Sequence, residues 1–250
     1  MHEQSPDSRR RFLLASSGIA AAGLMLSGCA TVGEHRGEDK EKEVTANEDL
    51  MREHGVLRRA LLVYRLSAAR LRINEKSVAP DGLNKTAMLF GTFGEDYHER
   101  QLEEPFIFPA VKQAHPALSG LVDTLMVQHQ RGREITDYII DVTRGSSIGA
   151  GKVEPLVRAM DTMVLMYEEH TAREDTVLFP AWKDALSGRQ YDELNDKFEE
   201  IEHRTFGKDG FEDAVKKIAD IEARLGIADL AQFTAPRAPS VKARSSEKTR

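Results

Sequence analysis

The sequence contains very little cysteine and few aromatic residues. Cys29 is the single cysteine among the 250 residues, so the chain can form no internal disulfide and no cluster of thiolate metal ligands. Phe, Trp and Tyr together make up 6% of the residues, while the helix formers Ala, Leu, Glu, Lys and Arg are abundant. This composition predicts an all-helical protein.

An excess of positive charge is also absent. The chain has 35 Lys and Arg residues against 41 Asp and Glu residues, and the net charge of -6 argues against a nucleic-acid partner. The hydrophobic fraction of 40% and the charged fraction of 30% are ordinary for a globular protein. A chain of this length can bury one sizeable core.

One long uncharged run occurs near the N-terminus. It extends from Phe12 to Leu26, directly after Arg9, Arg10 and Arg11. This pattern is typical of a twin-arginine export signal, and the run is too short to span a membrane comfortably. The run ends in the tetrapeptide Leu-Ser-Gly-Cys, which closes at Cys29 and resembles a bacterial lipoprotein box. We therefore expect export, acylation of Cys29 and a lipid-anchored location in the periplasm or cell envelope. An uncleaved N-terminal anchor is the alternative.

Composition divides the chain into five parts. Residues 1–29 are the expected signal peptide, and residues 30–45, rich in Gly, Glu and Lys, are an expected flexible tether. Residues 46–187 are the expected helical domain, followed by one or two short C-terminal helices over residues 188–234. Residues 235–250, rich in Pro, Ser, Lys and Arg, are an expected disordered tail.

Four long segments of the central part repeat apolar residues at the helical period. Each of them carries one histidine on its apolar face, and these four are His54, His98, His129 and His170. Two shorter helices are expected at about residues 189–204 and 211–225, separated by a glycine-containing break. The histidines of the four long helices should therefore face a shared core.

Two of these segments repeat a motif. A His and a following Glu precede a Phe-Pro pair in both, with His98 and Glu103 in one copy and His170 and Glu174 in the other. The His and the Glu are five residues apart in the first copy and four in the second. Both spacings place an imidazole and a carboxylate on nearly the same helix face. The five-residue spacing requires either a local bulge in the helix or rotation of Leu102 away from the site.

This arrangement predicts a metal site. A lone histidine on an apolar face is more often a core or solvent-reaching residue, but four of them, with two inward carboxylates, are costly to bury without a cation. Imidazoles and carboxylates without a thiolate suit iron, manganese or zinc. Two carboxylates between imidazole-rich ends favour two irons.

Together these residues resemble the hemerythrin-like, or HHE cation-binding, family, over about residues 48–182. The resemblance implies an up-down four-helix bundle with an oxo- or hydroxo-bridged di-iron centre. The ligands that it implies in this chain are His54, His98, Glu103, His129, His170 and Glu174.

One position departs from the oxygen carriers of that family, which have a further histidine four residues after the third-helix histidine. Here that position holds Arg133, which leaves one iron open and puts reversible oxygen carriage in doubt. Candidates to replace the ligand are His203, Tyr97 and Glu134. Arg133 itself either orients a bound peroxide, balances the carboxylates or forms an ordinary surface ion pair.

The resulting prediction is a non-haem di-iron protein that binds or reduces O2, H2O2 or NO; its electron donor is not predicted. The alternative is a non-catalytic module that binds, stores or senses iron or oxygen. A third interpretation is a ferritin-like carboxylate site, because Glu95 with His98 and Glu200 with His203 match the Glu-x-x-His pattern.

Overall fold

Helices make up most of the part of the chain that the structure describes. The computed structural model describes residues 44–149 and 151–238, and no strand occurs among them. The first helix, α1 (Ala46–Ile73), begins at Thr45, whose side chain and that of Glu48 form a capping box. The predicted all-helical class is confirmed, whereas the signal peptide, Cys29 and most of the tether and tail lie outside the described residues.

Two long segments contain stretches of π-helix. The elements after α1, in chain order, are α2 (Pro80–Leu89), the π-helix η1 (Phe90–Ile107), α3 (Phe108–Ala114), the 3-10 turn η2 (Pro116–Leu118), α4 (Ser119–Thr143), α5 (Val153–Arg173), the π-helix η3 (Glu174–Leu178), α6 (Phe179–Asp184), α7 (Gly188–Phe206), α8 (Gly210–Leu225) and the 3-10 turn η4 (Leu230–Phe233). The second expected helix is therefore α2, η1 and α3 in succession, and the fourth is α5, η3 and α6.

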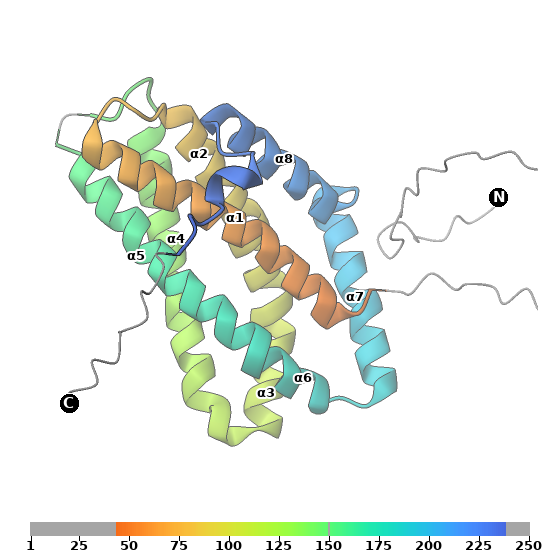
Figure 1. Cartoon of the computed structure of the whole chain (residues 1–250). Helices are drawn as coiled ribbons and strands as arrows, with labels where there is room; N and C mark the ends of the chain where they lie inside the picture. The colour runs from red at the N-terminus through yellow and green to blue at the C-terminus, as the bar shows by residue number, and fades with distance from the viewer. Residues whose placement is uncertain (1–43, 150, 239–250) are drawn as a thin grey trace, which may run out of the picture.

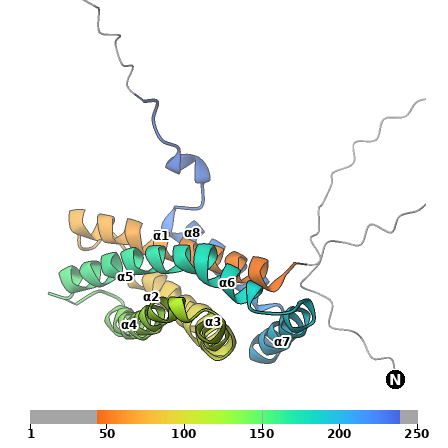
Figure 2. The ribbon, with the colours of Figure 1, turned by 90° about the horizontal axis from the view of Figure 1, so that it is seen from below.

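The four long segments pack around one core. α1 lies along α5, α5 packs on α4, α4 packs on α2 and η1, and η1 returns to α1 (Figure 1). α8 lies across α1 and α2, while α7 lies against α1 and η1 at the side of the bundle (Figure 2). This closed order of neighbours brings one face of each segment to a common interior.

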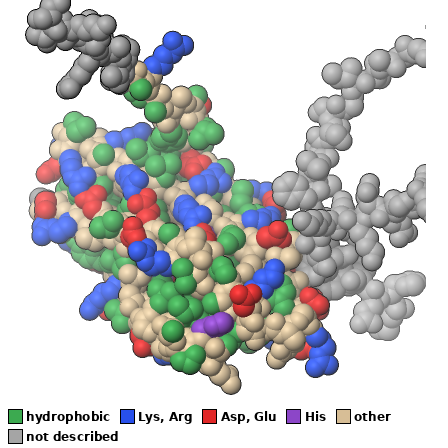
Figure 3. Space-filling view, turned by 60° about the horizontal axis from the view of Figure 1, so that its bottom comes forward, with side chains coloured by type: hydrophobic (Ala, Val, Ile, Leu, Met, Phe, Trp, Pro, Cys, Tyr) green, Lys and Arg blue, Asp and Glu red, His purple; other side chains and the backbone are tan. Residues whose placement is uncertain are grey.

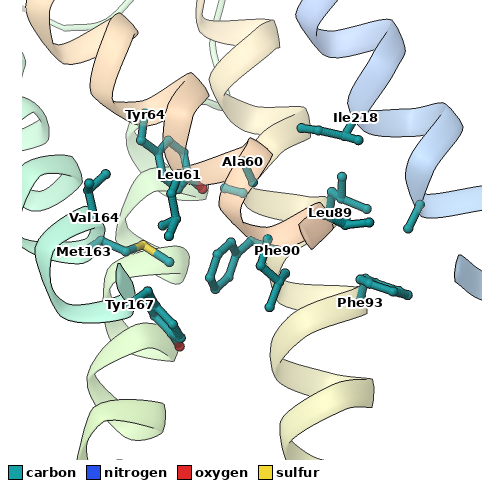
Figure 4. Close-up of a cluster of buried hydrophobic side chains, with 14 of the residues drawn as sticks. Ala60, Leu61, Tyr64, Leu89, Phe90, Phe93, Met163, Val164, Tyr167 and Ile218 are labelled. Atoms are coloured by element: carbon teal, nitrogen blue, oxygen red, sulfur yellow. The ribbon is translucent and has the colours of Figure 1, made fainter. Parts of the chain in front are cut away.

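The core is apolar on the side where α8 covers the bundle. Phe90 and Tyr167 meet there with ring centroids 4.8 Å apart and nearly perpendicular planes, among Leu61, Met163 and Ile218 (Figure 4). Burial of such side chains provides most of the stabilising free energy of a helical bundle. A second apolar group at the opposite end contains Trp182, which stacks on Phe198 of α7.

The two C-terminal helices have the expected positions. α7 begins after Ser187, whose side chain and that of Gln190 form a capping box, and ends at Gly207, which has a φ of 67°. α8 ends at Gly226, also at φ 67°, a conformation that favours glycine. Their lengths of 19 and 16 residues make them full helices rather than short appendages. Among the described residues, no helix is both long and apolar enough to cross a membrane.

Candidate metal centre

Six of the predicted site residues lie together in the interior of the bundle. None of them exposes more than 2% of its surface. They come from all four long segments, and they are His54 of α1, His98 and Glu103 of η1, His129 of α4, His170 of α5 and Glu174 of η3. On the face shown in Figure 3, acidic and basic side chains are interspersed and histidine is almost absent, in keeping with this burial.

Each of the two glutamates lies between two histidines. Glu103 Oε1 is 3.2 Å from His98 Nε2, and its Oε2 is 3.3 Å from His129 Nε2. Glu174 Oε1 is 3.0 Å from His170 Nε2, and its Oε2 is 3.5 Å from His54 Nε2. Each carboxylate thus offers one oxygen to each of two imidazole pairs.

These atoms form two adjoining groups that could hold a cation. Single donor atoms of Glu103, His129, His170 and Glu174 lie within 4.8 Å of one another, as do those of His54, His98 and Glu103. We call them the His129–His170 position and the His54–His98 position. They share Glu103, and Glu174 reaches His54 as well as His170.

Several polar atoms of this cluster are buried and form no hydrogen bond among the described residues. Both oxygens of Glu103, both oxygens of Glu174 and Nε2 of His98 are buried without a hydrogen-bond partner among the described residues. An unsatisfied buried carboxylate is costly, and cations bound between the imidazole pairs would satisfy these atoms. The donor set therefore fits one or two metal ions bound by nitrogen and oxygen.

The outer nitrogen of every imidazole has a hydrogen-bond partner. The four Nδ1 distances are 2.7 Å from His54 to Asp175, 2.6 Å from His98 to Glu53, 3.0 Å from His129 to Glu104 and 2.9 Å from His170 to the amide oxygen of Gln128. Because each Nδ1–H donates outward, Nε2 is the ring atom of each imidazole that faces the metal positions and is left to bind a metal. The tautomer that a metal ligand needs is therefore fixed by the chain itself.

These partners follow a cyclic pattern. Each is the sequence neighbour of a candidate ligand on a different segment: Glu53 precedes His54, Gln128 precedes His129, Glu104 follows Glu103, and Asp175 follows Glu174. A residue of α1 thus accepts from the histidine of η1, and a residue of η1 accepts from the histidine of α4. In the same way, a residue of α4 accepts from the histidine of α5, and a residue of η3 accepts from the histidine of α1. The four segments can orient the site only when all of them are packed together.

Two arginines reinforce the ring from outside. Arg58 and Arg133 each follow the histidine of their own helix by four residues. Arg58 pairs with Asp175, and Arg133 pairs with Glu104 and lies 3.0 Å from Glu99. Arg133 therefore balances the carboxylates, which was one of its predicted roles, and its counterpart on α1 does the same.

The repeated Phe-Pro pairs cover the site. Phe108 stacks on His129 with ring centroids 5.3 Å apart, and Phe179 stacks on His54 at 5.4 Å. Each phenylalanine begins the α-helix that follows a π-helical segment, and the proline after it lies in the first turn of that α-helix, where the missing N–H is tolerated. The motif thus supplies one carboxylate and one apolar cover to a histidine of another helix.

Burial and neighbouring charges spread the pKa values of the cluster. Burial lowers the pKa of His129, but the charge of Glu99 and the nearby carboxylates of Glu103 and Glu104 outweigh it and raise that pKa to about 10. Burial, followed by the proximity of His129, lowers the pKa of His170 to about 3. Burial and the charge of Glu103 raise the pKa of Glu174. The metal-free cluster therefore holds protons that a cation would displace.

Comparison with known proteins identifies the family. Residues 45–182 match the Hemerythrin HHE cation binding domain, which is more than half of the chain and includes all six residues. The chain belongs to the hemerythrin HHE cation-binding family. It is also 43% identical over 233 residues to an uncharacterized protein of Mycobacterium tuberculosis and to one of Mycobacterium bovis, with 90% of each chain covered. No solved structure matches significantly.

The π-helix explains the unequal spacing within this HHE domain. η1 has the i→i+5 pattern of hydrogen bonding, which places residues five apart on one face. His98 and Glu103 are such a pair, and so are Glu99 and Glu104, which both contact Arg133. Of the two predicted possibilities, the structure therefore shows a change in helix geometry, while Leu102 is buried elsewhere at 1% exposure.

The structure places none of the three candidates for the missing ligand in the HHE cluster. His203 is exposed, because α7 turns Phe198, Ile201 and Glu202 inward instead, so its prediction as a ligand was wrong. Glu134 is exposed and pairs with Arg131. Tyr97 is buried but its hydroxyl donates to Glu53 at 3.1 Å, which makes it a support of the His98 partner.

The ferritin-like interpretation of the same histidines also fails on geometry. Its second histidine, His203, is exposed, and Glu95 accepts a 2.6 Å hydrogen bond from Thr136 instead of joining the cluster. The sequence analysis missed Glu53, Glu104, Gln128 and Asp175. Their position beside a predicted ligand was the available signal, but helical periodicity turns adjacent residues by about 100° and gave no reason to place them at the site.

Proposed function

We propose that this protein is a non-haem di-iron protein that binds or reduces a small ligand, namely O2, H2O2 or NO. The observation that carries the proposal is the pair of buried carboxylates, Glu103 and Glu174. Each extends one oxygen toward each of two imidazole pairs, and all four oxygens lack another partner among the described residues.

The donor set favours iron. Two imidazoles and shared carboxylates at each position, with no thiolate, belong to the ligand types that suit iron in helical bundles. Two irons held by these residues would supply the redox chemistry needed to bind or reduce a small ligand. Four side-chain donors at most per position also leave room for such a ligand, because each side chain offers one atom there.

The surroundings limit what can reach the centre. The six candidate ligands are buried, and Phe108 and Phe179 cover two of the imidazoles. A cavity of about 20 Å³, room for a single water molecule, reaches Glu53 and Tyr97 between α1, η1 and α7. None of the six candidate ligands lines this cavity. The burial of the ligands supports a diatomic molecule or peroxide as the bound molecule and argues against a larger substrate.

The test is metal content together with turnover. The full chain produced with iron should contain about two irons and show charge-transfer bands in the near-ultraviolet, and it should consume added peroxide while these bands change. Two irons with stoichiometric ligand binding and no peroxide loss would select the non-catalytic binding module. One iron or none would reject the di-iron centre.

A matched pair of variants locates the metal. His129→Ala should lose at least half of the iron, whereas His115→Ala should keep it, because His115 lies outside the cluster and contacts the carbonyl of Ala181. Retention of both irons by His129→Ala would place the metal elsewhere.

We further propose that the protein is exported by the twin-arginine route and anchored through an acylated Cys29. The support is the order of Arg9, Arg10, the uncharged run and Cys29 in the sequence. Replacing Arg9 and Arg10 by Lys should hold the protein in the cytoplasm, and Cys29→Ala should release it from the membrane fraction. Unchanged fractionation of both variants would reject the proposal.

A further inference from the structure

The site has an approximate two-fold symmetry in its contacts. α1 corresponds to α4, and η1 corresponds to α5 with η3. We call the histidines of α1 and α4, which lie outside the His–Glu–Phe-Pro motif, the lone histidines. Each lone histidine, each copy of the motif and each arginine four residues after a lone histidine has a counterpart. The corresponding pairs are His54 and His129, His98 and His170, Glu103 and Glu174, Glu104 and Asp175, Arg58 and Arg133, and Phe108 and Phe179.

The two halves of the site differ in the residue that immediately precedes the lone histidine. That residue is Glu53 on α1 and Gln128 on α4. Both occupy equivalent places, because Glu53 accepts from His98 Nδ1 at 2.6 Å and Gln128 accepts from His170 Nδ1 at 2.9 Å. One member of the pair is a carboxylate with 1% exposure, and the other is a half-buried neutral amide.

This difference changes the strength of the imidazole donors. A carboxylate that accepts the Nδ1–H makes a charge-assisted hydrogen bond, roughly twice as strong as a neutral one, and it raises the basicity of Nε2. At the His54–His98 position both imidazoles have such a partner, Asp175 and Glu53. At the His129–His170 position only His129 has one, because Gln128 faces His170.

A further carboxylate, Glu99, does not remove the difference. Its Oε2 is 3.8 Å from His129 Nδ1 and 3.0 Å from Arg133. Its Oε1 accepts from the hydroxyl of Tyr167 at 2.8 Å. Glu99 is therefore occupied by other donors and accepts no hydrogen bond from His170.

We propose that the two metal positions are inequivalent, with the His54–His98 position binding a divalent cation tightly and the His129–His170 position binding it exchangeably. The determinant is the residue before each lone histidine, Glu53 or Gln128. This inference rests on the two-metal centre proposed above. The exchangeable position is then the one that loses and regains its ion when the metal supply changes.

Chelator competition with cobalt(II) tests the inference without any activity assay. The metal-free full chain is saturated with cobalt, and the ions retained per chain are measured over a series of chelator concentrations. The wild type should bind two ions and release them in two steps whose dissociation constants differ by about 10-fold to 100-fold, the usual effect of an outer hydrogen-bond partner.

Two reciprocal substitutions identify the determinant. Gln128→Glu should tighten the weaker constant by about 10-fold and leave the tighter one unchanged. Glu53→Gln should weaken the tighter constant by about 10-fold and leave the weaker one unchanged. A merely structural role would weaken both constants in both variants. The double variant, which exchanges the two side chains, should restore the two-step release.

The controls repeat the chemistry at exposed positions. Gln130→Glu and Glu134→Gln alter the charge of α4 on its solvent side and should change neither constant. Two results would overturn the inference while leaving the two-metal centre intact. One is an unchanged ratio of the two dissociation constants in Gln128→Glu, and the other is an effect of both reciprocal variants on the same dissociation constant. Binding of fewer than two cobalt ions by the wild type would overturn the centre and the inference together.

Discussion

The carboxyl groups inside this bundle differ in the partners that stabilise them. Glu103 and Glu174 face the metal positions, and Glu53 and Glu104 hold imidazoles, but Glu95 has neither use. Glu95 is 4% exposed and accepts a hydrogen bond from Thr136, and burial raises its pKa to about 8. Its side chain is therefore largely neutral at pH 7, one turn away from the charged cluster.

A raised carboxyl pKa makes stability depend on pH with a defined sign. Between the unfolded pKa of 4.5 and the folded value of about 8, the folded protein binds more protons at Glu95, so the free energy of unfolding falls as pH rises. The total contribution is of the order of 5 kcal/mol at most. Glu95→Gln should therefore gain stability relative to the wild type between pH 5 and pH 9 in urea denaturation of the metal-free protein.

The difference between variant and wild type isolates Glu95 from the other titrating groups. Asp96→Asn removes an exposed neighbouring carboxylate that pairs with Arg100, and this control should show little change in that difference with pH. Equal pH profiles for Glu95→Gln and the wild type would contradict the raised pKa.

Among the elements, α4 and α5 meet at a glycine that leaves no room for a side chain. A Cβ added at Gly132 would lie 1.9 Å from the hydroxyl oxygen of Tyr167, which is itself held by Glu99 and packed against Phe90. The small residue thus admits a tyrosine hydroxyl between the helices, beside the ring of His170 at a centroid distance of 5.3 Å. The spacing of these two helices at the site depends on this contact.

Replacing this glycine by alanine should distinguish the effect of packing on the free energy of unfolding from the effect of helix propensity. Gly132→Ala should lower the free energy of unfolding by about 1–3 kcal/mol, because Tyr167 has no free space to enter. Gly55→Ala is the matched control, since a Cβ there meets no atom within 4 Å and alanine is the better helix former. It should raise the free energy of unfolding by about 0.5–1 kcal/mol. Destabilisation of equal size in both variants would show that the contact does not matter.

For the whole molecule, the cluster joins all four long helical segments. The cyclic pattern of Nδ1 hydrogen bonds requires all four to be in place, and five buried atoms at its centre have no partner among the described residues. Metal binding should therefore be coupled to the stability of the whole bundle rather than to one helix.

Metal removal should lower the thermal stability of the entire chain in one transition. Free metal at about 1,000 times its dissociation constant adds about 4 kcal/mol to the free energy of unfolding. For a domain of this size, that corresponds to a shift of about 10 °C in the melting temperature. Differential scanning calorimetry of metal-free and iron-loaded protein measures it. Magnesium, which prefers an all-oxygen site, is the control and should produce no shift. A melting temperature independent of iron would contradict the coupling.

The amino-acid sequence by itself determined the helical class, the inward faces and the types of ligand. Apolar residues at the helical period placed His54, His98, His129 and His170 on buried faces, because that period depends only on local backbone geometry. The Phe-Pro repeat identified Glu103 and Glu174 as inward-facing carboxylates, because the spacing within the repeat also depends only on local backbone geometry. These features need no knowledge of how the helices pack.

Only the tertiary structure decided which side chains meet across helices. Periodicity defines a face but not its neighbour, so it could not pair His170 with Gln128 or Arg133 with Glu104. It also could not decide whether His203, one of three candidates for the missing ligand, reaches the cluster, and the structure leaves this histidine exposed. The five-residue spacing of His98 and Glu103 left a local bulge and a rotation of Leu102 both open, and only the structure shows the π-helical turns of η1. Packing of four segments around shared carboxylates is a property of contacts distant in sequence, and those contacts set the two unequal metal positions proposed for this chain.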